Sequence, residues 1–193
     1  MLKTLFITTV LVASAASLAA QTYPTNSYMV NYFSSDPVLA RITSQGSDLA
    51  NGAGTNNGPA DPAGNLCAMI YVFEPDQQMA ECCGCGLTPN ALLTLDGSNL
   101  LNNTLTGAPL PTGMIKIVSS TGYPGCNPAK PTPATGLSAW ATHTQTLGFI
   151  TETPFQNSTL STGELKDLAN TCAIITKEGS GAGVCNCGGS GPI

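Results

Sequence analysis

The pattern of apolar and polar positions along the chain predicts a protein built mostly from short strands. Residues 66–73 (LCAMIYVF) form a continuous apolar run, which is typical of a central strand that is buried on both faces. Residues 79–85 (MAECCGC) follow a turn at 74–78 and are expected to return beside that strand as a hairpin. Further strands are expected at residues 22–33, 38–43, 113–119, 137–144 and 147–153.

Alternation predicts which side chains share a face in two of these strands. In the first strand, Tyr28, Val30 and Tyr32 fall on one face. In residues 137–144, His143 shares its face with small and apolar residues. This alternation is typical of half-buried strands.

One amphipathic helix is expected near residues 162–178. Ser161-Thr162-Gly163-Glu164 is a capping box, in which the serine oxygen accepts a hydrogen bond from the Glu164 amide and the Glu164 side chain bonds back. Apolar residues then recur at the spacing of one buried stripe: Leu165, Leu168, Ala169, Cys172 and Ile175.

The first 20 residues have the three zones of a cleavable signal peptide. Lys3 gives a positive start, an apolar core follows, and small residues end at Ala19-Ala20. The apolar core is shorter than the ~20 residues that a membrane-spanning helix needs. We therefore expect residues 1–20 to be removed and residues 21–193 to form a single domain that is secreted or periplasmic. Within it, residues 21–65 would be a partly extended arm followed by a loop rich in Gly and Asn.

Composition narrows the class of protein further. Charged residues make up 9% of the chain, and without Lys3 the 5 basic and 11 acidic side chains give a mature charge of −6. That balance argues against nucleic acid and anionic membranes as partners. The 21 glycines and 14 prolines favour many turns. Together these features predict a mainly β fold: a disulfide-stapled, antiparallel β-sandwich-like domain with one α-helix near the C-terminus.

The cysteines are the strongest chemical signal in the chain. There are eight, an even number that indicates up to four disulfides in a secreted protein. The candidates are Cys67, Cys82, Cys83, Cys85, Cys126, Cys172, Cys185 and Cys187.

Local geometry limits some of the pairings. A hairpin centred near Asp76 places Cys67 opposite Cys83 or Cys85. Either one could bridge to Cys67, or the cysteines could pack together while bonding elsewhere. Cys82 and Cys83 are adjacent, so they point to opposite sides of a strand and are expected to bond to different partners. The last two cysteines of the chain, Cys185 and Cys187, are expected to link the tail to the core.

A metal site is the alternative interpretation of these cysteines. Residues 83–86 and 185–188 are two similar C-x-C-G elements, and four thiolates from them could surround zinc. The usual zinc spacing is C-x₂₋₄-C, however, and an oxidising compartment competes for the thiols. We therefore favour disulfides, and we expect neither a bound metal nor a cofactor.

Candidate catalytic residues are few, and the chain is not expected to be an enzyme. His143 is the sole histidine; it is either a general base or a strand residue bonded to a neighbouring threonine. Among the carboxylates, Glu74 and Asp76 lie in a proposed turn, whereas Glu81 and Glu152 lie in possible strands that could meet across a cleft. A glycosidase needs such a pair about 5–10 Å apart in its cleft. One Trp and 6% aromatic residues offer little to line that cleft.

The loop at residues 48–65 is a candidate calcium site. It carries the oxygen-bearing side chains Asp48, Asn51, Asn56, Asn57, Asp61 and Asn65. Oxygen ligands of this kind suit calcium, but the order of an EF-hand loop is missing and an Asn/Gly turn cluster is the simpler interpretation.

Part of the chain resembles a known group of proteins. The resemblance is carried by Leu66-Cys67-Ala68-Met69-Ile70-Tyr71-Val72-Phe73, by Glu81-Cys82-Cys83-Gly84-Cys85 and by Cys185-Asn186-Cys187-Gly188. These segments resemble uncharacterised secreted cysteine-rich bacterial proteins, a group with no established activity. The resemblance implies export and a shared cysteine framework.

The leading functional hypothesis is a non-catalytic structural or surface-assembly protein, for example a subunit of an extracellular filament or matrix. Its partners would be further copies of itself or other extracellular proteins, and residues 22–33 could add as a strand to a neighbour's sheet. The alternative is a binding module for glycans or calcium that uses the loops at 48–65 and 121–136. A small secreted hydrolase around His143 and a carboxylate is the third possibility.

Overall fold

The computed structural model describes residues 23, 26–34, 39–45, 64–96, 102–144, 148–178 and 187. The predicted signal peptide, Cys185 and nearly all of the 48–65 loop lie outside the described residues. The elements are β1 (Tyr28–Ser34), β2 (Leu39–Ser44), β3 (Leu66–Phe73), β4 (Met79–Leu87), β5 (Leu92–Leu95), β6 (Thr112–Thr121), β7 (Thr132–Pro133), β8 (Leu137–Thr144), β9 (Ile150–Pro154), β10 (Gln156–Asn157) and α2 (Thr162–Glu178).

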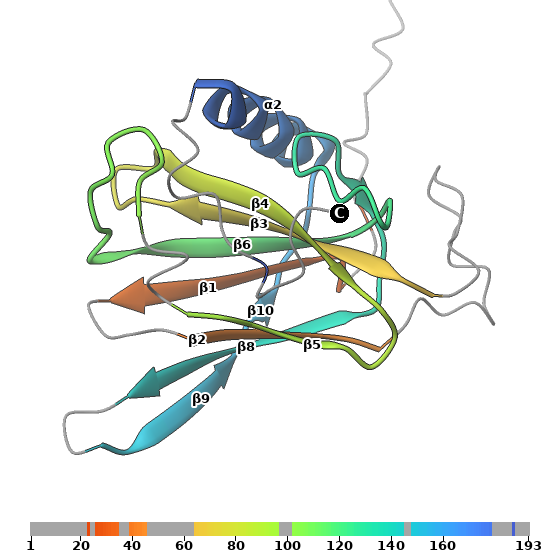
Figure 1. Cartoon of the computed structure of the whole chain (residues 1–193), viewed down its shortest axis with the longest axis horizontal. Coiled ribbons are helices and arrows are strands. Elements are labelled where there is room, and N and C mark those ends of the chain that lie inside the picture. The colour runs from red at the N-terminus through yellow and green to blue at the C-terminus, as the bar shows by residue number, and fades with distance from the viewer. Residues whose placement is uncertain are drawn as a thin grey trace, which may run out of the picture.

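These strands form two antiparallel sheets. One has the order β10-β1-β6-β3-β4, with β7 added to β6, and the other has the order β5-β2-β8-β9. In Figure 1 the two sheets form separate layers, and α2 lies across the outer face of the larger one. The mainly β, sandwich-like fold with one helix near the C-terminus is therefore confirmed. In the described part of the chain, α2 is too short and too polar to cross a membrane.

Two apolar cores follow from the alternation of side chains along the strands. On the central strand β3, Ile70 and Val72 point into the core between the sheets, whereas Met69 and Tyr71 point into a second core beneath α2. All of β3 except its last residue is buried, as predicted for a strand covered on both faces. The helix adds Leu168 to the second core, which anchors the helix to the sheet.

The β3–β4 hairpin contains a β-bulge that shifts the expected register. Phe73 pairs with Met79, but Val72 pairs with Glu81, so Ala80 is an extra residue in β4. As a result, Cys67 lies opposite Gly86 rather than opposite one of the cysteines of β4. The expected position of Cys67 opposite Cys83 or Cys85 is wrong, because a shift of one residue moves every side chain to the other face of the sheet. Of the two alternatives for these cysteines, bonding elsewhere is the one observed.

Three disulfides are described instead. They join Cys67 to Cys126, Cys82 to Cys172 and Cys85 to Cys187. Cys83 is also disulfide-bonded. The predicted separation of Cys82 from Cys83 and the predicted attachment of the tail through Cys187 are therefore confirmed. Cysteine richness, the disulfides and the β fold are compatible with a compartment outside the reducing cytosol.

The first strand is part of the fold. Each residue of β1 pairs with β6, from Tyr28 opposite Val118 to Ser34 opposite Thr112. The segment just before it is attached as well, because the Tyr23 amide donates a hydrogen bond to the Leu160 carbonyl at 3.1 Å. The idea that residues 22–33 form a free strand for a neighbouring subunit is therefore corrected, because β1 is already used within its own sheet.

Candidate binding groove at the open edge of the sandwich

The edge of β1 is only partly covered. The short strand β10 pairs with Met29 and Val30, and the Ser158 amide donates a hydrogen bond to the Tyr28 carbonyl at 3.0 Å. In an antiparallel ladder, alternate residues direct their backbone groups to the same side. Tyr32 therefore directs its N–H and C=O toward this edge, where no strand of the described part of the chain pairs with it.

A second open edge lies beside the first. Strand β9 ends the smaller sheet, and all five of its residues are exposed. The buried residue Phe155 lies between β9 and β10. At this residue the protein chain passes from the smaller sheet to the larger one. The Phe155 amide donates to the Ala139 carbonyl at 2.9 Å, so the crossing point is anchored to β8.

A groove of about 660 Å³ lies along this edge, and residues of β1, β6, β8, β9 and β10 line it. Such a volume lies within the usual range for small-molecule sites. The polar residues that line it are Asn31, His143, Thr153, Gln156, Asn157 and Ser158. The remaining lining residues are Tyr28, Val30, Tyr32, Met114, Lys116 and Pro154.

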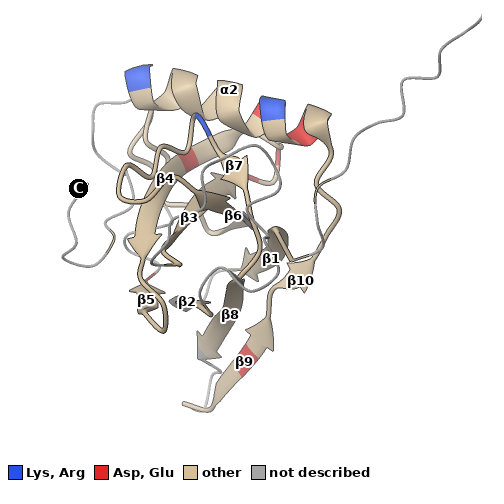
Figure 2. Cartoon of the chain, turned by 90° about the vertical axis from the view of Figure 1, so that its right-hand side faces the viewer, with Lys and Arg blue, Asp and Glu red and all other residues tan. Residues whose placement is uncertain are grey.

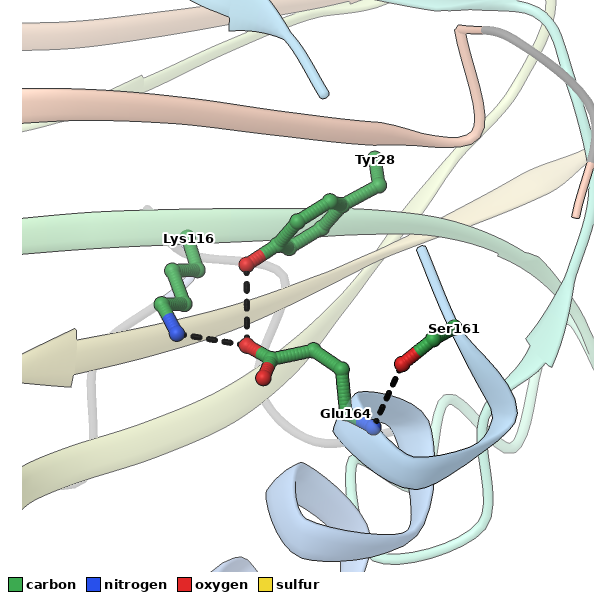
Figure 3. A network of polar contacts seen from close by, with 4 residues as sticks. All are labelled: Tyr28, Lys116, Ser161 and Glu164. Carbon is green, nitrogen blue, oxygen red and sulfur yellow. Dashed lines mark hydrogen bonds and ion pairs between the residues drawn. The ribbon is translucent and has the colours of Figure 1, made fainter. Parts of the chain in front are cut away.

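A charged network at one side of the groove attaches α2 to the sheet. Figure 3 shows Lys116 and Tyr28 directed toward the same carboxylate oxygen of Glu164, with Nζ at 2.5 Å and the phenol oxygen at 3.0 Å. Burial, together with the neighbouring carboxylate, raises the pKa of Tyr28 well above its ordinary value. The phenol therefore stays protonated and donates its hydrogen bond at any physiological pH.

The same network revises the expected capping box. The Ser161 hydroxyl accepts a hydrogen bond from the Glu164 amide at 3.1 Å, as predicted (Figure 3). The Glu164 side chain, however, bonds to Lys116 and Tyr28 rather than back to the cap. A carboxylate forms a stronger hydrogen bond with an ammonium group than with a backbone amide. This explains why the Glu164 side chain bonds to Lys116 and not to the cap.

His143 lies in the wall of the groove. Its Nε2 is 3.4 Å from the Thr153 hydroxyl on the neighbouring strand, which agrees with the interpretation of a strand histidine bonded to a threonine. The same hydroxyl lies 3.5 Å from the Asn31 side-chain nitrogen. These contacts connect β8, β9 and β1 across the groove.

The candidate carboxylates lie elsewhere. Glu152 forms an ion pair with Arg41 at 2.7 Å on the solvent-facing side of the smaller sheet. Glu81 lies on β4, at the opposite edge of the larger sheet, so Glu81 and Glu152 do not form the carboxylate pair that a glycosidase would need. Glu74 and Asp76 lie in the β3–β4 turn, as expected. Figure 2 shows that charged positions are sparse on the ribbon as a whole and that several lie on α2.

Glu81 is a buried carboxyl. It pairs with Val72, so its side chain shares the inner face of the sheet, and it is 0% exposed. Within the described residues, neither of its carboxylate oxygens has a hydrogen-bond partner. Burial raises the pKa of Glu81 to about 9, so the group is neutral at pH 7.

The structure joins the two C-x-C-G elements through the disulfide between Cys85 and Cys187. The sulfurs of Cys83, Cys85 and Cys187 lie within 4.8 Å of one another, a spacing that thiolates around a metal would also show. All three sulfurs are oxidised, however. The glycines have a packing role: a Cβ at Gly84 would lie 2.1 Å from the Cys126 carbonyl oxygen, and one at Gly86 would lie 2.8 Å from the Tyr123 ring.

No protein-family model, curated protein or solved structure matches this chain, so the interpretation of the groove rests on its own geometry.

This groove was not predicted from the sequence. A binding site was expected in the loops at 48–65 and 121–136, whereas the groove is formed by strand edges. The pair of Lys116 and Glu164 joins a strand to a helix 48 residues later, and no local pattern links the two. The alternation that placed Tyr28, Val30 and Tyr32 on one face was the one available signal, because these three residues all line the groove.

Proposed function

We propose that this protein is a secreted, non-catalytic binding protein that attaches to its partner through the groove between β1, β9 and β10. The observation that carries the proposal is a groove of about 660 Å³ at the edge of the sandwich where β1, β9 and β10 line one cleft. Its walls are strands, so the polar groups are held in fixed positions before a ligand arrives.

The chemistry of the groove supports binding rather than catalysis. The ammonium group of Lys116 is paired with Glu164, and His143 contacts a threonine hydroxyl rather than an acid. A nucleophile or a general base needs a partner that activates or orients it. The arrangement of these side chains suits recognition of a ligand more than its conversion.

A groove-filling substitution tests the proposal. Ser158 is exposed and lines the groove, whereas its exposed neighbour Thr159 does not, so Ser158→Trp and Thr159→Trp form a matched pair. We expect Ser158→Trp to abolish co-sedimentation of the mature protein with the extracellular matrix of its source cells, and Thr159→Trp to leave it unchanged. Equal binding by both variants would overturn the proposal.

Self-association through β9 is the second candidate function. Because the Phe155 amide bonds to β8, alternate residues of β9, including Ile150 and Glu152, direct their N–H groups outward. A strand from a second copy could pair with this edge. Pro154 lacks an N–H, so the added strand would be short.

This second candidate has its own test. Ile150→Pro removes an outward N–H that β8 does not use, and Ile150→Thr keeps it. Sedimentation at high protein concentration should show oligomers for the wild type and for Ile150→Thr, and monomers for Ile150→Pro. A wild type that stays monomeric throughout would eliminate assembly by this edge.

A further inference from the structure

We propose that the groove binds a neutral carbohydrate chain. This inference rests on the proposed binding function and specifies its ligand. The groove combines polar side chains that both donate and accept hydrogen bonds, an exposed aromatic ring and an internally neutralised charge. Each of these features matches one property of an uncharged sugar.

The polar lining matches hydroxyl groups. Amides supplied by Asn31, Gln156 and Asn157 offer a donor and an acceptor at each position, as do the hydroxyls of Thr153 and Ser158. A sugar hydroxyl also donates and accepts, so such groups can bind it in either direction. A phosphate or carboxylate ligand, by contrast, would require a surplus of donors and positive charge.

Tyr32 supplies the aromatic surface. This residue is 68% exposed, although it lines the groove and belongs to a strand that pairs with β6 along its whole length. The faces of a sugar ring that carry C–H groups are apolar. Packing such a face against the ring of a tyrosine is favourable because it removes apolar surface from water. The backbone N–H and C=O of Tyr32 face the open edge of β1. The tyrosine ring therefore lies beside a hydrogen-bond donor and a hydrogen-bond acceptor whose positions are fixed by the strand.

Charge selects against ionic ligands. Among the residues that line the groove, Lys116 is the one Lys, Arg, Asp or Glu. Its ammonium nitrogen is 2.5 Å from the Glu164 carboxylate, and the lysine side chain is 17% exposed. The pair presents little net charge to a ligand, so an acidic glycan would lose its hydration without gaining a counter-charge.

The groove is open to solvent, and the strands β1 and β9 that line it belong to different sheets. An open site of this kind can bind an internal segment of a carbohydrate chain as well as the end of that chain. An added peptide strand would use the edges of β1 and β9, and it would gain little from the amide side chains or from the Tyr32 ring. The lining therefore favours a carbohydrate over a peptide.

The test is a titration of the oxidised mature protein, followed by NMR, with neutral, uronate-containing and sulfated oligosaccharides. Tyr32→Ala is compared with Phe149→Ala, because Phe149 is 67% exposed but does not line the groove. We expect a neutral oligosaccharide to bind, Tyr32→Ala to weaken its binding about tenfold or more, and Phe149→Ala to have no effect. Affinity should be the same at about 50 and about 500 mM salt.

Three other results would overturn the inference. Binding of acidic oligosaccharides alone, or affinity that falls steeply with salt, would reassign the groove to an anion and leave the proposed binding function standing. Neutral binding that Tyr32→Ala does not change would place the ligand elsewhere. If no sugar binds while Ser158→Trp still abolishes attachment to the matrix, the ligand is of another class and the groove keeps its function.

Discussion

The two edges of this sandwich are stabilised in different ways. Each described disulfide has one cysteine on β3 or β4, and these bridges attach the loop with Cys126, the helix and the tail to that side of the molecule. At the opposite edge, hydrogen bonds join β1 to β9 and β10, and the pair of Lys116 and Glu164 joins β6 to α2. Covalent links thus lie on one side and the candidate groove on the other.

This division shows how a small β protein can keep an edge open. A disulfide acts mainly by restricting the unfolded chain, so it stabilises the whole fold wherever it is placed. The open edge can therefore rely on weak contacts without a loss of overall stability. We expect hydrogen exchange to be slowest in β3 and fastest in β9, since local stability follows burial.

The largest effect is expected from removing a bridge. Cys82 and Cys172 are 90 residues apart in the chain, so the double variant Cys82→Ala and Cys172→Ala should lose about 4–5 kcal/mol of unfolding free energy. Denaturant unfolding measures this loss. The affinity of the groove should not change while the protein remains folded. A variant that keeps wild-type stability but loses binding would contradict the division between the two edges.

Glu81 should make the cross-linked edge sensitive to pH. Its pKa rises from 4.5 when unfolded to about 9 when folded, so above pH 4.5 the unfolded chain ionises first and is favoured. As the pH rises, the free energy of unfolding should fall by about 1.4 kcal/mol per pH unit, which amounts to roughly 3 kcal/mol between pH 4.5 and 7. Glu81→Gln should abolish this slope.

Unfolding curves at several pH values measure this effect. The exposed Glu178 serves as the control site, since Glu178→Gln should keep the wild-type slope. If stability instead rose between pH 5 and 8 in the wild type, Glu81 would have a partner that stabilises its charge, and the account of its burial would be wrong.

The bulge at Ala80 marks the limit of prediction from the sequence: the strands could be predicted, but the register between β3 and β4 could not. Strands and helix follow from periodicity, so β3, β4 and α2 appear close to their expected ranges. The single extra residue then turns Glu81 into the core and sets Cys67 against Gly86. No local pattern marked that residue, because a bulge depends on the ladder with the partner strand.

The candidate groove was unpredictable for a related reason. It forms where two strand edges from different sheets lie side by side, and sheet order is a property of the whole fold. Its charge is set by the contact of Lys116 with Glu164, which belong to separate elements. The alternation of β1 placed Tyr32 beside Val30 and Tyr28 but did not show that its ring would stay exposed.

The glycines of β4 offer a smaller test of the cross-linked edge. Gly84→Ala would place a Cβ 2.1 Å from the Cys126 carbonyl oxygen, so the loop must shift, at a cost of about 1–3 kcal/mol. Gly125→Ala is the control, because its nearest contact would be an ordinary 3.7 Å. Thermal unfolding compares the two. Equal stability would mean that the loop can move freely, and the packing role of Gly84 would have to be abandoned.

The smallest effect is expected at the open edge itself. Lys116→Met keeps the apolar stem against Phe73, whose ring centre lies 4.6 Å from the ammonium nitrogen, but removes the ion pair with Glu164. The side chains of the pair are 17% and 32% exposed, so solvent screens them in part and the loss should be about 1 kcal/mol. The exposed Lys166 provides the control, Lys166→Met.

Hydrogen exchange distinguishes the two edges in this last case. Exchange in Lys116→Met should quicken in β1 and at the start of α2, whereas β3 and β4 should be unchanged because the disulfides still restrain them. High salt should reproduce part of the effect in the wild type. If exchange quickened equally in β4, the two edges would form one cooperative unit, and the open edge could not bind a ligand independently of the cross-linked one.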